Sequence, residues 1–103
     1  MEKLFKKYKV EWDINEFEKF EELMKDIKKR SETLSQRIKN RIKENINHIK
    51  QNPLLFEKDS LKINNDGSYR KFHAIHIRIA YKIEDDKIII ARVRHSSSDP
   101  LEY

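Results

Sequence analysis

The sequence predicts a two-layer α+β domain, in which an antiparallel sheet packs against a helical hairpin in the order β-α-α-β-β-β. Apolar residues recur every three or four positions over the first half of the chain, which is the period of an amphipathic helix. Over the last third they alternate with polar residues, which is the period of a strand. Because 103 residues suit one hydrophobic core, we expect residues 1–103 to form a single domain.

The chain is predicted to begin with a short strand and a helix. Residues 8–13 alternate enough to form a strand, and Trp12 is its large apolar residue. A helix is predicted from Asn15, the expected N-cap, to Arg30, with acidic side chains in its first turns and basic ones at its end, as the helix dipole favours. Its apolar stripe consists of Phe17, Phe20, Met24 and Ile27.

A second helix is predicted after a short turn, which makes a helical hairpin. Either Thr33 together with Gln36, or Ser35 alone, is the expected cap. The helix continues to Gln51, because the next residues are Asn-Pro and the residue before a proline avoids the helical region. The stripe of this helix consists of Leu34, Ile38, Ile42, Ile46 and Ile49.

Residues 53–67 connect the hairpin to the sheet. This connection ends in polar residues that are typical of turns, but its apolar side chains are expected to pack against the core. These apolar residues are Leu54, Leu55, Phe56, Leu61 and Ile63.

Three strands are predicted over residues 68–74, 76–83 and 87–94, and Asp85-Asp86 is expected to form a tight turn. Strands joined by short turns pair antiparallel. One face of the middle strand carries Ile77, Ile79, Tyr81 and Ile83, and the other carries His76, Arg78, Ala80 and Lys82. The apolar face is expected to meet the helices, which leaves the other face to basic residues.

Charge is distributed unevenly along the chain, whose formal net charge is +5. Residues 12–26 carry six acidic and two basic side chains, whereas residues 69–95 carry seven basic and three acidic ones together with three of the four histidines. A local basic field of this kind attracts polyanions, most often nucleic acid. The alternative is a solvated sheet face that binds nothing anionic.

Composition excludes several classes of site. There is no cysteine, which excludes disulfides and thiolate chemistry and fits a cytoplasmic protein. The single glycine, Gly67, excludes glycine-rich phosphate loops. His73 and His76 are expected on opposite faces of a strand, so we predict no metal site and no cofactor. No apolar run approaches the roughly 18 residues of a membrane span, so we expect no signal peptide and no membrane partner.

The segment HIRIAYKIEDDKIIIARVRH, residues 76–95, resembles the signature hairpin of the RelE/ParE toxin superfamily of toxin–antitoxin systems. The order of elements and the chain length are also similar to those of that superfamily. The resemblance implies a RelE-like fold and a type II toxin that cleaves mRNA, in association with the ribosome, by metal-independent attack of a 2′-OH on phosphate. It also implies a cognate RelB-like antitoxin that forms a hetero-oligomer with the toxin.

The same resemblance suggests catalytic roles for four residues. Arg78 matches the recurrent arginine of the superfamily, His95 the histidine after the last strand, and Tyr103 the terminal aromatic residue. His73 lies in a strand where members carry basic residues and is the fourth candidate. The candidates for RNA binding are Arg70, Lys71, Lys82, Arg92 and Arg94. Structural alternatives stay open, among them a surface Arg78 paired with Glu84 or Asp85, a His95 that closes the sheet and a Tyr103 that caps the core.

Two departures from the superfamily pattern leave the target open. The glycine that usually precedes the histidine is Arg94 here, and the basic residue that often follows it is Ser96. A ParE-like inhibitor of DNA gyrase, which needs no acid–base residues, is therefore the first alternative to a ribonuclease. A non-catalytic RNA-binding module is the second.

Overall fold

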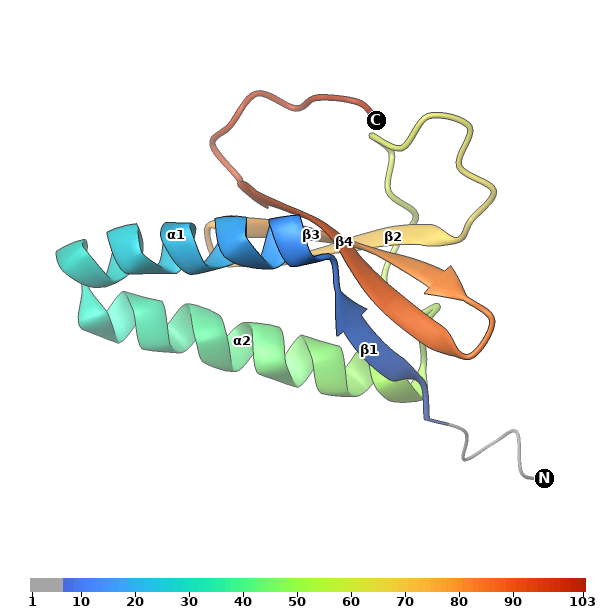
Figure 1. Ribbon diagram of the computed structural model, residues 1–103, viewed down its shortest axis with the longest axis horizontal. Helices are drawn as coiled ribbons and strands as arrows, with labels where there is room; N and C mark the ends of the chain where they lie inside the picture. Colours follow the sequence, from blue (N-terminus) through green and yellow to red (C-terminus); the bar gives the residue numbers. More distant parts are fainter. Residues whose placement is uncertain (1–6) are drawn as a thin grey trace.

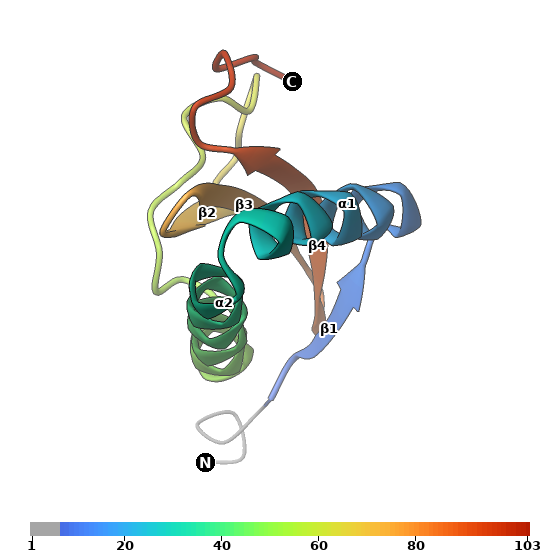
Figure 2. The same cartoon turned by 90° about the vertical axis from the view of Figure 1, so that its left-hand side faces the viewer.

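The computed structural model describes residues 7–103, and its elements follow the predicted order (Figure 1). They are β1 (Lys9–Trp12), α1 (Ile14–Arg30), α2 (Glu32–Gln51), β2 (Tyr69–Ala74), β3 (Ile77–Glu84) and β4 (Lys87–His95). Both helices lie on one side of the sheet, as Figure 2 shows, so the predicted α+β class is confirmed. Among residues 7–103, neither helix combines the length and the hydrophobicity that a membrane crossing requires.

The four strands form one sheet in the order β1-β4-β3-β2. The antiparallel pairs β2–β3 and β3–β4 were predicted, and Asp85 begins the turn between β3 and β4 with a φ of 51°. The first strand, however, pairs parallel with β4. The sheet is therefore mixed, and the prediction of an antiparallel sheet is wrong for β1. The physical reason is that the two helices form a long connection after β1, which lets it enter the sheet in the parallel direction.

The N-cap of α1 is Asp13 and not Asn15. The Asp13 carboxylate accepts hydrogen bonds from the backbone N–H groups of Asn15 (2.9 Å) and Glu16 (3.1 Å). Asn15 therefore lies inside the first turn, where it supplies one of the N–H groups that Asp13 caps.

A single residue, Ser31, separates the two helices. Its backbone N–H donates to the carbonyl of Ile27 (2.8 Å) and closes α1, while its hydroxyl accepts from the N–H of Leu34 (3.0 Å) and caps α2. The predicted caps Thr33 and Ser35 are therefore wrong, and Ser35 is buried within the helix. Because Ser31 serves both helices, no longer turn is needed.

The core lies between the helical hairpin and the sheet. It consists of Met24, Ile27, Ile38, Ile42, Ile49, Phe72, Ala74, Ile77, Ile79, Tyr81, Ile88, Ile90 and Val93. Tyr81 is the largest fully buried side chain, and its hydroxyl donates to the carbonyl of Pro53 (2.7 Å). Burial raises the pKa of Tyr81 to about 12, so its phenol stays neutral.

A β-bulge at Ala91 decides which face of β4 is basic. Tyr81 of β3 pairs with Ile90, whereas Ala80 pairs with Arg92, so one residue of β4 is left between them. Strict alternation from Ile90 would point Arg92 toward the helices. The extra residue reverses the alternation, which sends Arg92 and Arg94 to the other side. We call that side, opposite the helices, the open face of the sheet.

Two irregular segments extend over one end of the open face. They are the connecting loop, residues 52–68, and the C-terminal segment, residues 96–103. The N–H of Tyr103 donates to the carbonyl of Leu61 (3.0 Å), and the N–H of Ile63 donates back to the carbonyl of Tyr103 (2.6 Å). Figure 1 shows the C-terminal segment ending beside this loop.

The connecting loop buries fewer apolar residues than predicted. Phe56 packs against Phe72, with ring centroids 5.2 Å apart, as expected. Leu54, Leu55 and Ile63 are exposed, so the prediction is wrong for these three. Besides Phe56, two residues that were not predicted are buried in the loop, namely Pro53 and Asp59.

Candidate functional site

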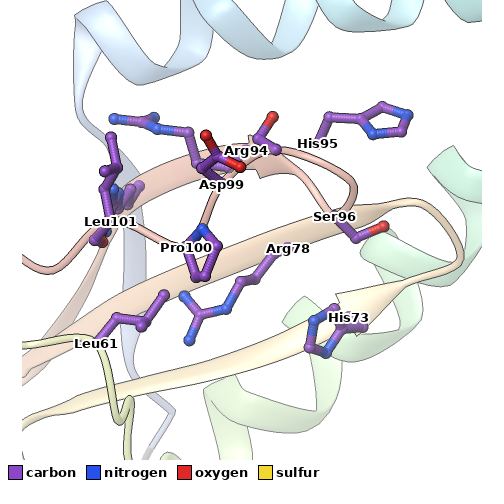
Figure 3. A pocket seen from close by; sticks show the side chains of 11 residues that line it. Leu61, His73, Arg78, Arg94, His95, Ser96, Asp99, Pro100 and Leu101 are labelled. Carbon is purple, nitrogen blue, oxygen red and sulfur yellow. The ribbon is translucent and has the colours of Figure 1, made fainter.

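A cavity of about 210 Å³ opens between the open face and the C-terminal segment (Figure 3). Five of the predicted site residues line it, namely His73, Arg78, Arg92, Arg94 and His95. His73 of β2, Arg78 of β3 and Arg94 of β4 pair in one row across the sheet. Leu61 of the connecting loop, Ser96 and residues 98–101 form the rest of the wall.

Two predicted catalytic residues meet at a buried carboxylate, Asp59. Its Oδ1 lies 2.5 Å from Nη2 of Arg78, and its Oδ2 accepts a hydrogen bond from the hydroxyl of Tyr103 at 2.5 Å. The partner of Arg78 is thus neither Glu84 nor Asp85. Sequence reasoning missed Asp59, because nothing in the sequence distinguishes it from the neighbouring acidic residues of the same loop, Glu57 and Asp66.

These contacts determine the protonation of Asp59 and Tyr103. Burial alone would raise the pKa of Asp59, but hydrogen bonds from Arg78, Tyr103 and the backbone N–H of Leu61 outweigh it and hold the pKa below its usual value. For Tyr103, burial and the hydrogen bond to the Asp59 carboxylate raise the pKa far above its usual value. Tyr103 therefore stays neutral, and its hydroxyl donates a hydrogen bond to the Asp59 carboxylate.

Asp59 orients Arg78 without saturating it. Two guanidinium nitrogens of Arg78 contact the carboxylate, at 2.5 and 3.4 Å. A guanidinium has five N–H donors, so three remain for another acceptor. The side chain of Arg78 lines the cavity, and the geometry leaves it able to bind an anion there.

Arg92 and Arg94 differ in how far their charge is compensated. Nη1 of Arg94 lies 2.7 Å from Oε1 of Glu16 on α1, whose carboxylate also accepts from the N–H of Val93 (2.9 Å). Arg92 is nearly buried, donates to the carbonyl of Leu101 (2.5 Å) and pairs with no carboxylate within residues 7–103. Arg92 is therefore the less compensated cation of the two.

The two histidines of the cavity have different settings. His73 lies opposite Arg78 in the sheet, and partial burial, followed by the charges of Lys71 and Arg78, lowers its pKa below the usual value. The imidazole of His73 is therefore neutral near pH 7 and can accept a proton.

His95 lies at the rim of the cavity, where Figure 3 shows its ring turned away from Arg78. Nδ1 of His95 accepts from the backbone N–H of Ser97 (3.2 Å) and lies 2.6 Å from its hydroxyl, so the neutral ring carries its proton on Nε2. The ring stacks on His76 with centroids 6.0 Å apart. His95 therefore does not join the contact between Arg78 and Tyr103.

The remaining predicted RNA-binding residues fall on both faces. Lys71 and Lys82 lie on the open face, where they pair with the carboxylates of Glu57 and Glu84. Arg70 lies on the helix side instead, and its guanidinium donates to the carbonyls of Phe56 and Gly67. No group of three or more His, Cys, Asp or Glu side chains suited to a metal ion occurs in residues 7–103.

Comparison with known protein families matches residues 18–100 to the family described as ParE toxin of type II toxin-antitoxin system, parDE. The match begins within α1 and ends in the C-terminal segment, so it spans nearly all of the residues that line the cavity. Comparison with curated proteins finds no match.

Proposed function

The chain belongs to the ParE toxin family of type II toxin–antitoxin systems, and we propose that this toxin acts as a metal-independent endoribonuclease on mRNA at the ribosome. The membership itself implies an antitoxin partner. The observation that supports RNA cleavage is the cavity, where Arg78 and Arg92 line the same space as the imidazole of His73.

The proposed reaction is attack of a ribose 2′-oxygen on the adjacent phosphorus, which breaks the bond to the 5′-oxygen and leaves a 2′,3′-cyclic phosphate. Arg78 and Arg92 bind the phosphate oxygens and stabilise the charge of the phosphorane. His73, neutral near pH 7, takes the proton of the 2′-OH. His95 turns its ring inward and, as the imidazolium, gives the Nε2 proton to the leaving 5′-oxygen and becomes a neutral imidazole.

Tyr103 and Asp59 act as positioning residues in this proposal. The neutral hydroxyl of Tyr103 donates a hydrogen bond to the Asp59 carboxylate, and this carboxylate in turn orients Arg78. The Tyr103 hydroxyl is thus a poor acid for the leaving group, which is the reason for assigning that step to His95.

The test is expression of the toxin in a host cell, followed by mapping of 5′ ends on cellular mRNA. We expect cuts in phase with codons in translated mRNA, and a His73→Gln variant should cut at least about 100-fold more slowly, because acid–base groups contribute at least that factor. Both His73 and the control His48 of α2 are exposed, so neither variant should unfold the protein, and His48→Gln should cut like the wild type.

Arg78 needs a paired design, because Arg78→Ala alone would leave the Asp59 carboxylate buried and unpaired. The double variant Arg78→Ala/Asp59→Asn removes both charges, and we expect it to fold and to lose cleavage. Toxicity with intact mRNA in the wild type would contradict the ribonuclease proposal.

A ParE-like inhibitor of DNA gyrase is the second candidate. Two observations favour it: the ring of His95 is turned away from Arg78, and the hydroxyl of Tyr103 is held by Asp59. The four predicted catalytic side chains therefore do not converge on one point. An inhibitor of this kind acts by binding and needs no proton transfer. It predicts that His73→Gln stays toxic, that mRNA stays intact and that plasmid supercoiling by gyrase is blocked.

A further inference from the structure

Beside the cavity, the open face carries a second group of side chains, which we call the tyrosine cluster. It consists of Lys62, Tyr69, Lys82, Arg92 and Tyr103. We propose that this cluster is a stacking platform for bases of single-stranded RNA that flank the phosphate in the cavity. The inference rests on the proposed ribonuclease function for its substrate, but Tyr69, the residue that the test changes, takes no part in the proposed reaction.

The two rings of the cluster are held edge to face and are surrounded by cations. The centroids of Tyr69 and Tyr103 are 5.9 Å apart, at an interplanar angle of 83°. Nζ of Lys62 lies 4.9 Å from the centroid of Tyr69 and 5.5 Å from that of Tyr103. Nζ of Lys82, which faces Tyr69 across β2 and β3, lies 5.7 Å from the same ring. Cations at these distances make cation–π interactions with the face of an aromatic ring.

The tyrosine cluster is continuous with the cavity. The guanidinium of Arg92 lies 4.4 Å from the centroid of Tyr103 and also lines the cavity. Tyr69 and His73 are four residues apart on the same face of β2, which is roughly 13 Å along a strand. An extended nucleotide strand bound at Arg78 and Arg92 therefore reaches the tyrosine rings within a short distance.

Tyr69 remains accessible to a ligand. Its hydroxyl makes no hydrogen bond to residues 7–103, and no buried side-chain oxygen in that range lacks a partner, so this hydroxyl reaches solvent. Lys62 forms no ion pair within the described residues, where its Nζ donates only to the carbonyl of Ile63 (3.2 Å). A half-buried tyrosine with a solvent-facing hydroxyl, beside a lysine without an ion pair, suits a single strand, since bases stack on aromatic rings while the cation meets phosphate.

The test compares two uncleavable probes of equal length, a 2′-O-methyl oligo(A) and its abasic counterpart, by fluorescence anisotropy with the full chain. We expect Tyr69→Leu to weaken oligo(A) binding about 5- to 150-fold, the range for loss of one stacked base, and to leave abasic binding unchanged. Tyr69→Phe keeps the ring and should bind oligo(A) like the wild type. Circular dichroism confirms that each variant is folded.

The outcomes separate this proposal from the proposed function. Equal affinities of wild type and Tyr69→Leu for oligo(A), or an equal loss for both probes, would overturn the platform even if RNA cleavage is found. A selective loss of oligo(A) binding supports the platform even if no cleavage is found, in which case only the ribonuclease proposal fails. A wild-type protein that binds neither probe overturns the platform.

Discussion

Asp59 is the residue on which three separate parts of the chain meet, because it lies in the connecting loop and binds Arg78 of β3 and Tyr103 of the C-terminal segment. We expect Asp59→Ala to lower the free energy of unfolding by about 3–5 kcal/mol, since it leaves a mostly buried guanidinium without its partner. Urea denaturation measures the change. Asp26→Ala, at an exposed position on α1, is the matched control and should change it by less than about 0.5 kcal/mol.

The contribution of Asp59 also has a definite pH dependence. The pKa of Asp59 is lowered in the folded protein, so its stabilisation is complete above the usual carboxyl value of 3.8 and is lost as the pH falls through the lower folded value. The wild type should therefore exceed Asp59→Asn in stability at pH 7 and lose that advantage in acid. A difference that stays constant from pH 7 to acid would contradict the lowered pKa.

His73 provides a second test at the residue scale. Partial burial and the positive charges of Lys71 and Arg78 lower its pKa, so its imidazole resists protonation in the folded protein. We expect Lys71→Gln to raise the pKa of His73, because the variant removes one of these charges and frees the carboxylate of Glu57 beside it. An NMR titration of the imidazole carbon protons measures this. An unchanged or lower pKa would show that neighbouring charge does not control this histidine.

Among the elements, the helical hairpin depends on one capping residue. Ser31→Ala removes the hydroxyl that caps α2, and we expect the free energy of unfolding to fall by about 1 kcal/mol. Thr33→Ala, at one of the two caps that the sequence pattern predicted, should cost less, because Thr33 is exposed and already within the helix. Thermal or urea unfolding of the two variants compares them directly. A larger loss for Thr33→Ala would reassign the cap.

Features that depend on near neighbours in the chain were predictable from the sequence. The apolar stripes located both helices, although α2 begins at Glu32, two to four residues before the start that the predicted caps imply. The alternation in β3 assigned Ile77 and Ile79 to the core and Arg78 to the open face. The helix caps were not predictable in the same way, because several residues near each helix start have capping side chains. Which of them caps the helix depends on where the backbone turns.

Features that depend on distant parts of the chain were not predictable. The parallel entry of β1 and the bulge at Ala91 leave no periodic signal, although the bulge alone places Arg92 on the open face. The site shows the same limit. Its histidines and arginines matched a family pattern, but Asp59 becomes part of it only when the loop folds back onto β3.

For the whole molecule, the most acidic stretch of the chain and the basic strands lie in different places. Residues 12–26, which include most of α1, carry six acidic and two basic side chains, whereas the open face carries basic residues of β2, β3 and β4. Glu16 is the exception, because it is buried against Arg94 and the N–H of Val93 at the edge of β4. The helix α2 is itself basic, with five Lys or Arg side chains against two Glu. A polyanion is therefore expected to approach the open face and not the acidic part of α1, although the net charge of +5 alone would not favour either side.

This separation predicts how RNA binding responds to salt. Each phosphate contact on a single strand changes the slope of log K against log salt concentration by about −0.7. With Arg78, Arg92 and Lys62 as contacts, we expect a slope of about −2. Lys62→Gln should reduce its magnitude by about 0.7, because that lysine forms no ion pair within residues 7–103 and its charge is free to meet phosphate.

Lys43→Gln is the matched control, because Lys43 is an exposed lysine on α2, in the layer away from the open face. It removes the same charge from the protein, so net charge alone would make both variants lose affinity equally. A contact surface on the open face instead requires that Lys43→Gln keep the wild-type slope while Lys62→Gln does not. If the two variants have equal slopes, Lys62 makes no phosphate contact and the RNA does not bind beside it. A charge that lies more than roughly one Debye length from the RNA is screened and has little effect on binding.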